Sequence, residues 1–472
     1  MFKSGESIGL AVNCESSANA VATLPVPWRG PRSILRAACA PPEDTDIDKQ
    51  HSRTPSPAYA NYVLVLLSLV YVVNFIDRQI LAMLIVPIKE EFGVSDTALG
   101  LLSGFAFALL YTLAGIPIAR WADRGSRTRI IALALTLWSA VTAACGLARS
   151  FVELALLRVL VGVGEAGGNP PSHSLIADYF PPHKRATALS IYAWGVYIGS
   201  AIAFLAGGYL VTNYSWRTAF FVVGLPGLFL AAIVALTVRE LPRGASEQRV
   251  ESSVQPSFPE VLRHLLRRRA FVYIVLGASV QSLSGYGVLT WGPTFLHRVH
   301  EMPWTEIGTF LGWIIGLAGC LGAYAGGRLA DRFGARDASW YMRLPALQSI
   351  AGVPFVLGFA LLPQQYSLLA FIPFYALGAM YVGPMFSMVQ GLVPLRMRAT
   401  ASALLLFVVN LIGLGLGPLS VGVLNDYVFG PHYGELAIRY SMLVIGLLGG
   451  TASLLFWQAS RTLAADLALR ED

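Results

Sequence analysis

Residues 97–119 read TALGLLSGFAFALLYTLAGIPIA and contain no charged side chain. The chain turns polar directly afterwards, because residues 120–127 read RWADRGSR and hold three arginines. A helix of about 20 mostly apolar residues is long enough to cross the hydrocarbon layer of a membrane. The two stretches together therefore predict a membrane-spanning helix that ends in a basic loop.

Eleven further apolar stretches of this kind follow one another along the chain. With 97–119 they make twelve expected spans, at 61–88, 97–119, 130–149, 151–178, 186–212, 216–238, 270–296, 306–327, 344–362, 366–393, 400–426 and 438–458. The composition agrees, since 55% of the residues are hydrophobic and 13% are charged, against roughly 25% charged in soluble domains. We therefore predict an all-α membrane protein with 12 transmembrane helices in two groups of six.

Basic residues in the loops predict how the helices are oriented, because Lys and Arg are more frequent in loops on the cytoplasmic side. The loops after the even-numbered spans hold nineteen of them, and the loops on the other side hold five. This bias predicts that both termini lie in the cytoplasm. We expect the chain to be a multi-pass protein of the cell (inner) membrane. The net charge of +7 does not indicate nucleic-acid binding, because the basic residues sit at helix ends rather than on one continuous face.

Five segments follow from the pattern of spans. They are a disordered cytoplasmic tail at 1–58, a first six-helix half at 59–240, a cytoplasmic linker at 241–269, a second six-helix half at 270–460 and a cytoplasmic tail at 461–472. The first segment is rich in Pro and Ser and has no sustained apolar run, so we expect no signal peptide there. A start codon assigned too early would give the same pattern.

The linker contains one short amphipathic stretch. Its apolar residues fall on one helical face and are surrounded by arginines: Val261, Leu262, Leu265 and Leu266. This pattern is typical of an interfacial helix at anionic lipid headgroups. A solvated basic loop that serves only topology is the alternative.

The basic loop after the second span has a counterpart in the second half. Asp123-Arg124 and Asp331-Arg332 each lie between the second and third helix of their half. Internal repeats on this scale are typical of secondary transporters, in which the substrate site lies between the halves near mid-membrane.

These two loops resemble the G-x-x-x-D-R-x-G-R-R signature of the major facilitator superfamily. The copy at 327–336 matches closely, whereas the first copy has Ala119 and Ser126 where the family usually has glycine. The resemblance implies a cytoplasmic gate made of Asp123, Arg124, Asp331 and Arg332. Helix capping together with topology charge is the alternative role for these residues.

Four charged residues lie well inside the expected spans, all in the first half: Asp77, Arg78, Arg158 and Glu165. Ionisable groups at such depth are costly and mark a pathway, a proton relay or a buried pair. From the helix rise, Asp77 lies about 16 Å and Arg158 about 10 Å below the outer surface, close enough for the long arginine to reach the carboxylate. Glu165 follows two turns after Arg158, on the same helix face.

This placement suggests a proton-coupling mechanism for Asp77, Arg158 and Glu165. A carboxylate beside an arginine stays ionised, whereas an isolated one in an apolar site takes up a proton. If a conformational cycle makes and breaks the pair between Asp77 and Arg158, Asp77 binds and releases one proton per cycle. Glu165 is a second acceptor or competes for Arg158. A static salt bridge between the first and fourth helices is the alternative.

Arg78 points about 100° away from Asp77 on the helix, so it faces a substrate headgroup or extends towards the interface. The second half has no charge in its spans and offers a wall of polar and aromatic candidates for substrate binding: Gln281, Tyr286, Trp291, Tyr381 and Asn410. One charged wall and one apolar, aromatic wall suit an amphipathic ligand. Packing, or a belt at the membrane interface, is the alternative for each aromatic residue.

Several stretches together resemble the spinster family, and in particular a bacterial member. They are NFIDRQ at 74–79, RVLVGVGEA at 158–166, SLIADYF at 174–180, VRELPRG at 238–244 and NLIGLGLGP at 410–418. The resemblance covers about residues 60–460. It implies transport of sphingosine-1-phosphate or a lysophospholipid, with Asp77, Arg158 and Glu165 at the family's functional positions.

We therefore expect a proton-coupled transporter of an amphipathic lipid-like substrate that works by alternating access as a monomer among membrane lipids. An organic-acid/proton symporter and a passive lipid scramblase or sensor are the alternatives. We expect no enzyme activity and no cofactor or metal, because Ser172 and His173 have no nucleophile or metal partner at useful spacing. The four cysteines likewise form no ligand pattern.

Overall fold

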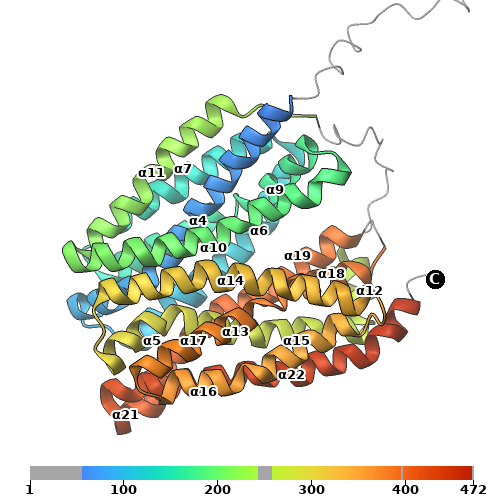
Figure 1. The fold of residues 1–472 in the computed structure, drawn as a ribbon. Helices are drawn as coiled ribbons and strands as arrows, with labels where there is room; N and C mark the ends of the chain where they lie inside the picture. The colour runs from blue at the N-terminus through green and yellow to red at the C-terminus, as the bar shows by residue number, and fades with distance from the viewer. Residues whose placement is uncertain (1–55, 243–257, 395–396, 470–472) are drawn as a thin grey trace, which may run out of the picture. The chain divides into compact units, whose positions relative to one another are not determined.

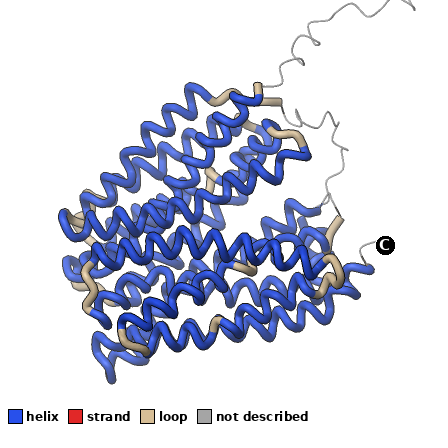
Figure 2. Tube along the Cα trace, in the orientation of Figure 1, coloured by secondary structure: helices blue, strands red, loops and turns tan. Residues whose placement is uncertain are grey.

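The computed structural model describes residues 56–242, 258–394 and 397–469. Within these ranges the regular structure is helical throughout and contains no strand (Figures 1 and 2). The expectation of a disordered tail falls on residues 1–55, which lie outside the described part of the chain, as does most of the linker, 243–257.

The first half runs from α4 to α11 (Figure 1). Its elements are α4 Pro57–Phe92, α5 Asp96–Gly100, η2 Leu101–Phe105, α6 Ala106–Arg124, α7 Arg127–Cys145, α8 Phe151–Glu165, α9 Asn169–Tyr179, α10 Pro182–Asn213 and α11 Trp216–Thr237.

The second half runs from α12 to α22 and ends near the C-terminus. Its elements are α12 Phe258–Leu266, α13 Arg269–His300, α14 Trp304–Gly334, α15 Trp340–Ala351, α16 Val353–Leu361, α17 Gln364–Ala379, α18 Val382–Gly391, α19 Arg398–Val409, η4 Asn410–Leu416, α20 Gly417–Val423, η5 Leu424–Phe429, α21 Gly430–Tyr433, η6 Gly434–Leu436 and α22 Ala437–Ala468.

Ten stretches of the described residues are long and apolar enough to cross a membrane. One of them, at 400–468, is 69 residues long and contains two crossings, because α21 and η6 interrupt it. A further crossing consists of α8 with α9, whose pieces of 15 and 11 residues are too short to be counted separately. Counted in this way, the structure confirms the predicted twelve spans in two groups of six.

Serine side chains define the starts of several helices in the first half. In each case the hydroxyl oxygen accepts the backbone N–H three residues further on, which satisfies one of the free donors at a helix start. The capping residues are Ser56, Ser95, Ser126, Ser150 and Ser215. Small polar residues therefore fix the ends from which the long apolar helices run.

The fourth span is divided because its middle is poor in helix-forming residues. After Glu165 the chain turns through residues 166–168, and α9 then begins with a proline in its first turn. Gly164 packs so closely on Trp138 that a Cβ there would lie 2.9 Å from the Trp138 Cβ. Through this contact the end of α8, which contains Glu165, packs against α7.

One end of the helices, called the tail side, is where α4 begins at Pro57 and α22 ends at Ala468. The other end, called the Asp96 side, is where α4 ends and α5 begins. The halves meet where α10 runs beside α14 (Figure 1) and where α4 packs on α13. A Cβ on Gly308 would lie 2.4 Å from the backbone oxygen of Phe204, so α10 and α14 touch backbone to backbone near the Asp96 side.

The amphipathic stretch of the linker forms α12. Val261 and Leu265 are fully buried in a cluster with Phe271 and other residues of the second half, whereas Leu266 is 60% exposed. One part of the apolar face therefore packs on protein, and the position of α12 at a membrane surface stays a prediction.

Candidate transport site

The centre of the first half contains a buried ion pair between α4 and α8. Asp77 and Arg158 are 1% and 2% exposed, and the Arg158 Nη1 donates to the Asp77 Oδ1 over 2.8 Å. The second oxygen of Asp77 accepts the hydroxyl of Thr142 on α7. This is the pair that the helix rise predicts from the sequence, and both oxygens of its carboxylate are hydrogen-bonded.

A second ion pair lies beside the first one and joins the same two helices. The Nη2 and Nε of Arg78 donate to one oxygen of Glu165, Oε2, over 2.6 and 3.2 Å. Glu165 is 1% exposed, and its other oxygen, Oε1, has no hydrogen-bond partner among the described residues. Glu165 therefore binds Arg78 rather than competing for Arg158, which the sequence did not predict.

Aromatic rings surround the guanidinium of Arg78. Its Cζ lies 5.2, 5.0 and 4.9 Å from the ring centres of Phe75, Phe107 and Tyr111. Rings at this distance attract a cation through their electron-rich faces. Tyr286 of the second half also interacts with Arg78, so this guanidinium lies where the two halves meet.

The candidates from the second half differ in how they are placed. Tyr286 is half-buried beside Arg78, and Gln281 accepts the Ser349 hydroxyl over 2.9 Å. Tyr381 and Asn410 are half-buried, with the Tyr381 ring 6.2 Å from that of Phe456.

Trp291 is packed within the second half in this structure, and its role in substrate binding stays a prediction. It is fully buried, and its indole N–H donates to the backbone oxygen of Pro418 over 2.9 Å. The face that a buried helix turns to its neighbours depends on tertiary packing, which a uniformly apolar sequence does not reveal.

The residues expected to form a cytoplasmic gate lie at the tail side. Asp331 accepts the hydroxyl of Tyr341 from its own half over 2.8 Å, and Arg124 and Arg332 are exposed. The side chain of Asp123 falls outside the described part of the structure. Their role as a gate therefore stays a prediction.

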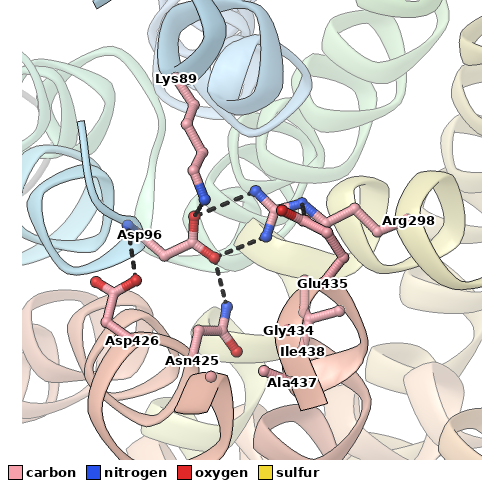
Figure 3. A pocket seen from close by; sticks show the side chains of 10 residues that line it. Lys89, Asp96, Arg298, Asn425, Asp426, Gly434, Glu435, Ala437 and Ile438 are labelled. Carbon is pink, nitrogen blue, oxygen red and sulfur yellow. Dashed lines mark hydrogen bonds and ion pairs between the residues drawn. The ribbon is translucent and has the colours of Figure 1, made fainter. Parts of the chain in front are cut away.

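A cluster at the opposite end joins the two halves, and the sequence did not point to it (Figure 3). Asp96, which is 2% exposed, accepts hydrogen bonds from Lys89, Arg298 and Asn425 over 2.7 to 3.1 Å. Asp426 of the second half accepts the backbone N–H groups of Asp96 and Thr97 over 3.2 and 2.6 Å. We call Lys89, Asp96, Arg298, Asn425 and Asp426 the Asp96 cluster.

Glycines bring the backbones of the two halves together beside this cluster. A Cβ on Gly422 would lie 2.4 Å from the backbone oxygen of Asp96, and one on Gly100 would lie 2.6 Å from that of Pro418. A cavity of about 170 Å³ remains between the cluster and Glu435. The halves are thus closed against each other at the Asp96 side.

A further charged group at the tail side holds the segment where the first half passes into the linker. Arg127, 1% exposed, pairs with Asp178 and, over 2.7 Å, with Glu240. Glu240 also accepts the Ser126 hydroxyl and the Thr128 N–H, each over 2.9 Å. Burial raises the pKa of Glu240, but these hydrogen bonds and the charge of Arg127 outweigh it and hold the pKa below its ordinary value.

The model of the Major Facilitator Superfamily matches residues 67–418, and the chain belongs to this family of transporters. An MFS-type efflux pump of Mycolicibacterium smegmatis is 33% identical over 89% of this chain and 97% of that protein. The protein spinster homolog 1 of Xenopus tropicalis is 26% identical over 86% of this chain and 83% of its own length.

A solved structure has the same fold. It is that of a bacterial homolog to the human lysosomal transporter spinster, in an inward-facing and unoccupied conformation. The two chains share 32% identity and a TM-score of 0.80, over 87% of this chain and 99% of that one. The resemblance to spinster proteins is therefore confirmed along nearly the whole described chain.

Proposed function

We propose that the chain is a proton-coupled secondary transporter of an amphipathic, lipid-like substrate of the sphingosine-1-phosphate or lysophospholipid type. The observation that carries this proposal is the pair of buried ion pairs, Asp77–Arg158 and Arg78–Glu165, with Arg78 turned towards Tyr286 of the second half. Charged groups at this depth in a transporter fold are the expected machinery of a substrate and proton pathway. Spinster relatives and the spinster-like structure support the lipid assignment.

Exchange at Arg78 couples substrate to proton in this proposal. An anionic headgroup that binds the guanidinium competes with Glu165 for the same donors. Once displaced, Glu165 is a carboxylate without its cation in an apolar surrounding, and it takes up a proton. Asp77 takes part in the same way if the cycle separates it from Arg158. Gln281, Tyr286, Tyr381 and Asn410 line the opposite wall, and Trp291 supports it from behind.

Alternating access then requires the Asp96 cluster to open while the tail side closes. The tail side faces the cytoplasm of the cell (inner) membrane, as the loop charges predict. The closing gate there consists of Asp123, Arg124, Asp331 and Arg332. One chain contains both halves of the site, so the transporter works as a monomer.

A second candidate is proton-driven efflux of amphipathic compounds other than lipids. The 33% identical relative named an MFS-type efflux pump favours it. Such an efflux pump would use the same charged residues of the first half. It would differ from a lipid transporter only in the substrate that the second half accepts.

The test is transport in liposomes that carry the purified chain under an imposed pH gradient. Three labelled probes are followed: a lysophospholipid, a cationic amphipathic dye and a small organic acid. The variants are Asp77→Asn and Glu165→Gln, with the exposed Asp337→Asn as the control. Gradient-dependent lysophospholipid movement that both site variants abolish and the control retains supports the proposal.

Other outcomes reject parts of it. Movement of the dye alone assigns the efflux function, and movement of the organic acid alone assigns a symporter. Lysophospholipid equilibration without a gradient, unchanged in Glu165→Gln and Asp77→Asn, indicates a passive scramblase and excludes proton coupling.

A further inference from the structure

A small cavity lies directly beside Glu165 in the first half. It is lined by residues of α4, α7, α9 and α10 together with the end of α8, among them Tyr71, Trp138, Asn169 and Tyr192. Its volume is about 10 Å³, which is the space that the centre of one water molecule needs.

Two residues of the cavity lining each carry a buried polar atom that has no hydrogen-bond partner among the described residues. Within the described residues, neither the Oε1 of Glu165 nor the indole Nε1 of Trp138 is hydrogen-bonded, although the two residues are each 1% exposed. An acceptor and a donor left unpaired in a dry site are costly, and a buried water molecule is the usual partner for such groups. The cavity therefore has the size and the polar lining of a water site.

An ordered array of hydroxyl and amide groups borders the same cavity. The Tyr192 hydroxyl donates to the Asn169 Oδ1 over 2.6 Å, and the Asn169 Nδ2 donates to the Tyr71 hydroxyl over 3.4 Å. The rings of Tyr71 and Tyr192 stack in parallel, with centres 4.5 Å apart. The Tyr71 ring meets that of Phe75 edge-on at 5.1 Å, and the Arg78 Cζ lies 5.2 Å from the centre of the Phe75 ring, so the array extends towards Arg78.

We propose that one water molecule occupies this cavity and carries the proton between the boundary of the halves and Glu165. The Tyr71 hydroxyl gives its proton to the water and is reprotonated by a proton from solvent that reaches the boundary of the halves. The water passes a proton to Oε1, so that the carboxylate becomes a carboxylic acid. The reverse transfer returns the proton and restores the charge that faces Arg78. Asn169 and Tyr192 are positioning residues that hold the water and the Tyr71 hydroxyl in line.

The charged and titratable groups around this route are few. Arg78, Asp77 and Arg158 face Glu165, and the ring of His173 meets that of Tyr192 edge-on at 5.2 Å. The inference rests on the proposed proton coupling, because it supplies the path to a carboxylate that the proposed cycle protonates.

Gly168 offers a test that removes no polar group. It borders the cavity, and a Cβ built there would lie 3.4 Å from the Glu165 backbone oxygen and the Trp138 ring, which is ordinary contact. Gly168→Ala therefore adds a methyl group to the lining of the small cavity without forcing its neighbours apart. Gly115→Ala, where a Cβ meets nothing within 4 Å, is the matched control.

The measurement is time-resolved infrared spectroscopy of the full chain in liposomes after a pH jump. The protonated carboxyl band of Glu165 is assigned by its loss in Glu165→Gln. In Gly168→Ala and Asn169→Leu we expect protonation to slow by at least about tenfold. Tyr209→Phe and Asn213→Leu on the exposed end of α10 keep the native rate.

The outcomes separate the two proposals. If Glu165→Gln removes no band, Glu165 does not take up a proton and the proposed function fails with it. If the band is present but Gly168→Ala keeps the native rate, the water route is wrong and the proposed function stands. A slow Gly168→Ala with a normal Asn169→Leu supports the water and rejects the positioning role of Asn169.

Discussion

The two buried ion pairs differ in how completely their carboxylates are satisfied. Asp77 binds Arg158 and Thr142 with separate oxygens, whereas Glu165 binds Arg78 with one oxygen only. A buried pair needs close geometry and further hydrogen bonds to offset the loss of hydration. Both oxygens of Asp77 are therefore satisfied, whereas Glu165 keeps one acceptor free for the proton uptake that we propose.

Arg158→Met tests the pair of Asp77 with Arg158. The substitution leaves Asp77 buried without its cation, and we expect it to lower stability by about 3–5 kcal/mol. The double variant Arg158→Met with Asp77→Asn removes the uncompensated charge and recovers a large part of that loss. Both are compared with the native chain by thermal unfolding in detergent. Equal losses in the single and double variants would contradict a structural ion pair.

Glu240 gives a prediction for pH. Its folded pKa lies below the ordinary value of 4.5, so its contribution to stability is complete above about pH 4.5 and is lost as the pH falls through the folded pKa. We expect Glu240→Gln to lower the unfolding midpoint at pH 7 and to approach the native chain below pH 4. The exposed Glu306→Gln is the control. A difference that stays constant between pH 7 and pH 4 would show that Glu240 acts without its charge.

The two buried ion pairs show which side-chain contacts could be predicted from the sequence. The Asp77–Arg158 pair was predictable because helix rise fixes the depth of each residue, and a long arginine tolerates an error of several ångströms. The Arg78–Glu165 pair was not, because the direction of each side chain depends on how α4 and α8 pack.

Among the contacts between the halves, the start of α5 carries a group of charged links. The carboxylate of Asp426 caps its first two N–H groups from the other half, and an acidic group is favoured at a helix N-terminus. Asp96, the first residue of α5, in turn holds Lys89 and Arg298. Charged links at this helix start therefore add to the glycine contacts that close this side.

Asp96→Asn is expected to open the Asp96 side. The amide keeps the shape of the side chain but leaves Lys89 and Arg298 facing each other without a negative charge between them. Spin labels at Tyr214→Cys and Glu306→Cys, placed on a cysteine-free background, report the distance between the two halves at this side. We expect the distance distribution to shift towards longer values.

Asp337→Asn is the matched control, because Asp337 lies at the tail side and pairs with Arg343 of its own half. It should leave the distribution between the two labels unchanged. An unaltered distribution in Asp96→Asn as well would show that the glycine contacts alone keep this side closed.

The Asp96 cluster could not be predicted, because it depends on how separate helical elements pack against one another. Lys89 and Arg298 read as ordinary charges at helix ends, which topology alone explains. Asp96 and Asp426 are 330 positions apart, and only the packing of α5 against α20 brings them together.

On the scale of the whole molecule, the twelve spans could be predicted because each one satisfies its own backbone and needs only length and apolar content. The breaks within spans could not. The turn between α8 and α9 falls in a run of glycines and prolines that membrane helices often tolerate without a break. The same uniform hydrophobicity hides which helix face meets a neighbour, so the burial of Trp291 could not be predicted.

The orientation of the chain in the membrane is the remaining whole-molecule prediction. If the loop charges set it, the tail side faces the cytoplasm and the Asp96 side faces outward. Asn213→Cys or Glu306→Cys is introduced into a cysteine-free version of the chain and expressed in cells. In intact cells the new cysteine should react with a membrane-impermeant maleimide. Asp337→Cys and Lys184→Cys should react only after the membrane is permeabilised. The reverse pattern would mean that the arginine-rich loops face outward, and it would place the closed Asp96 side at the cytoplasm.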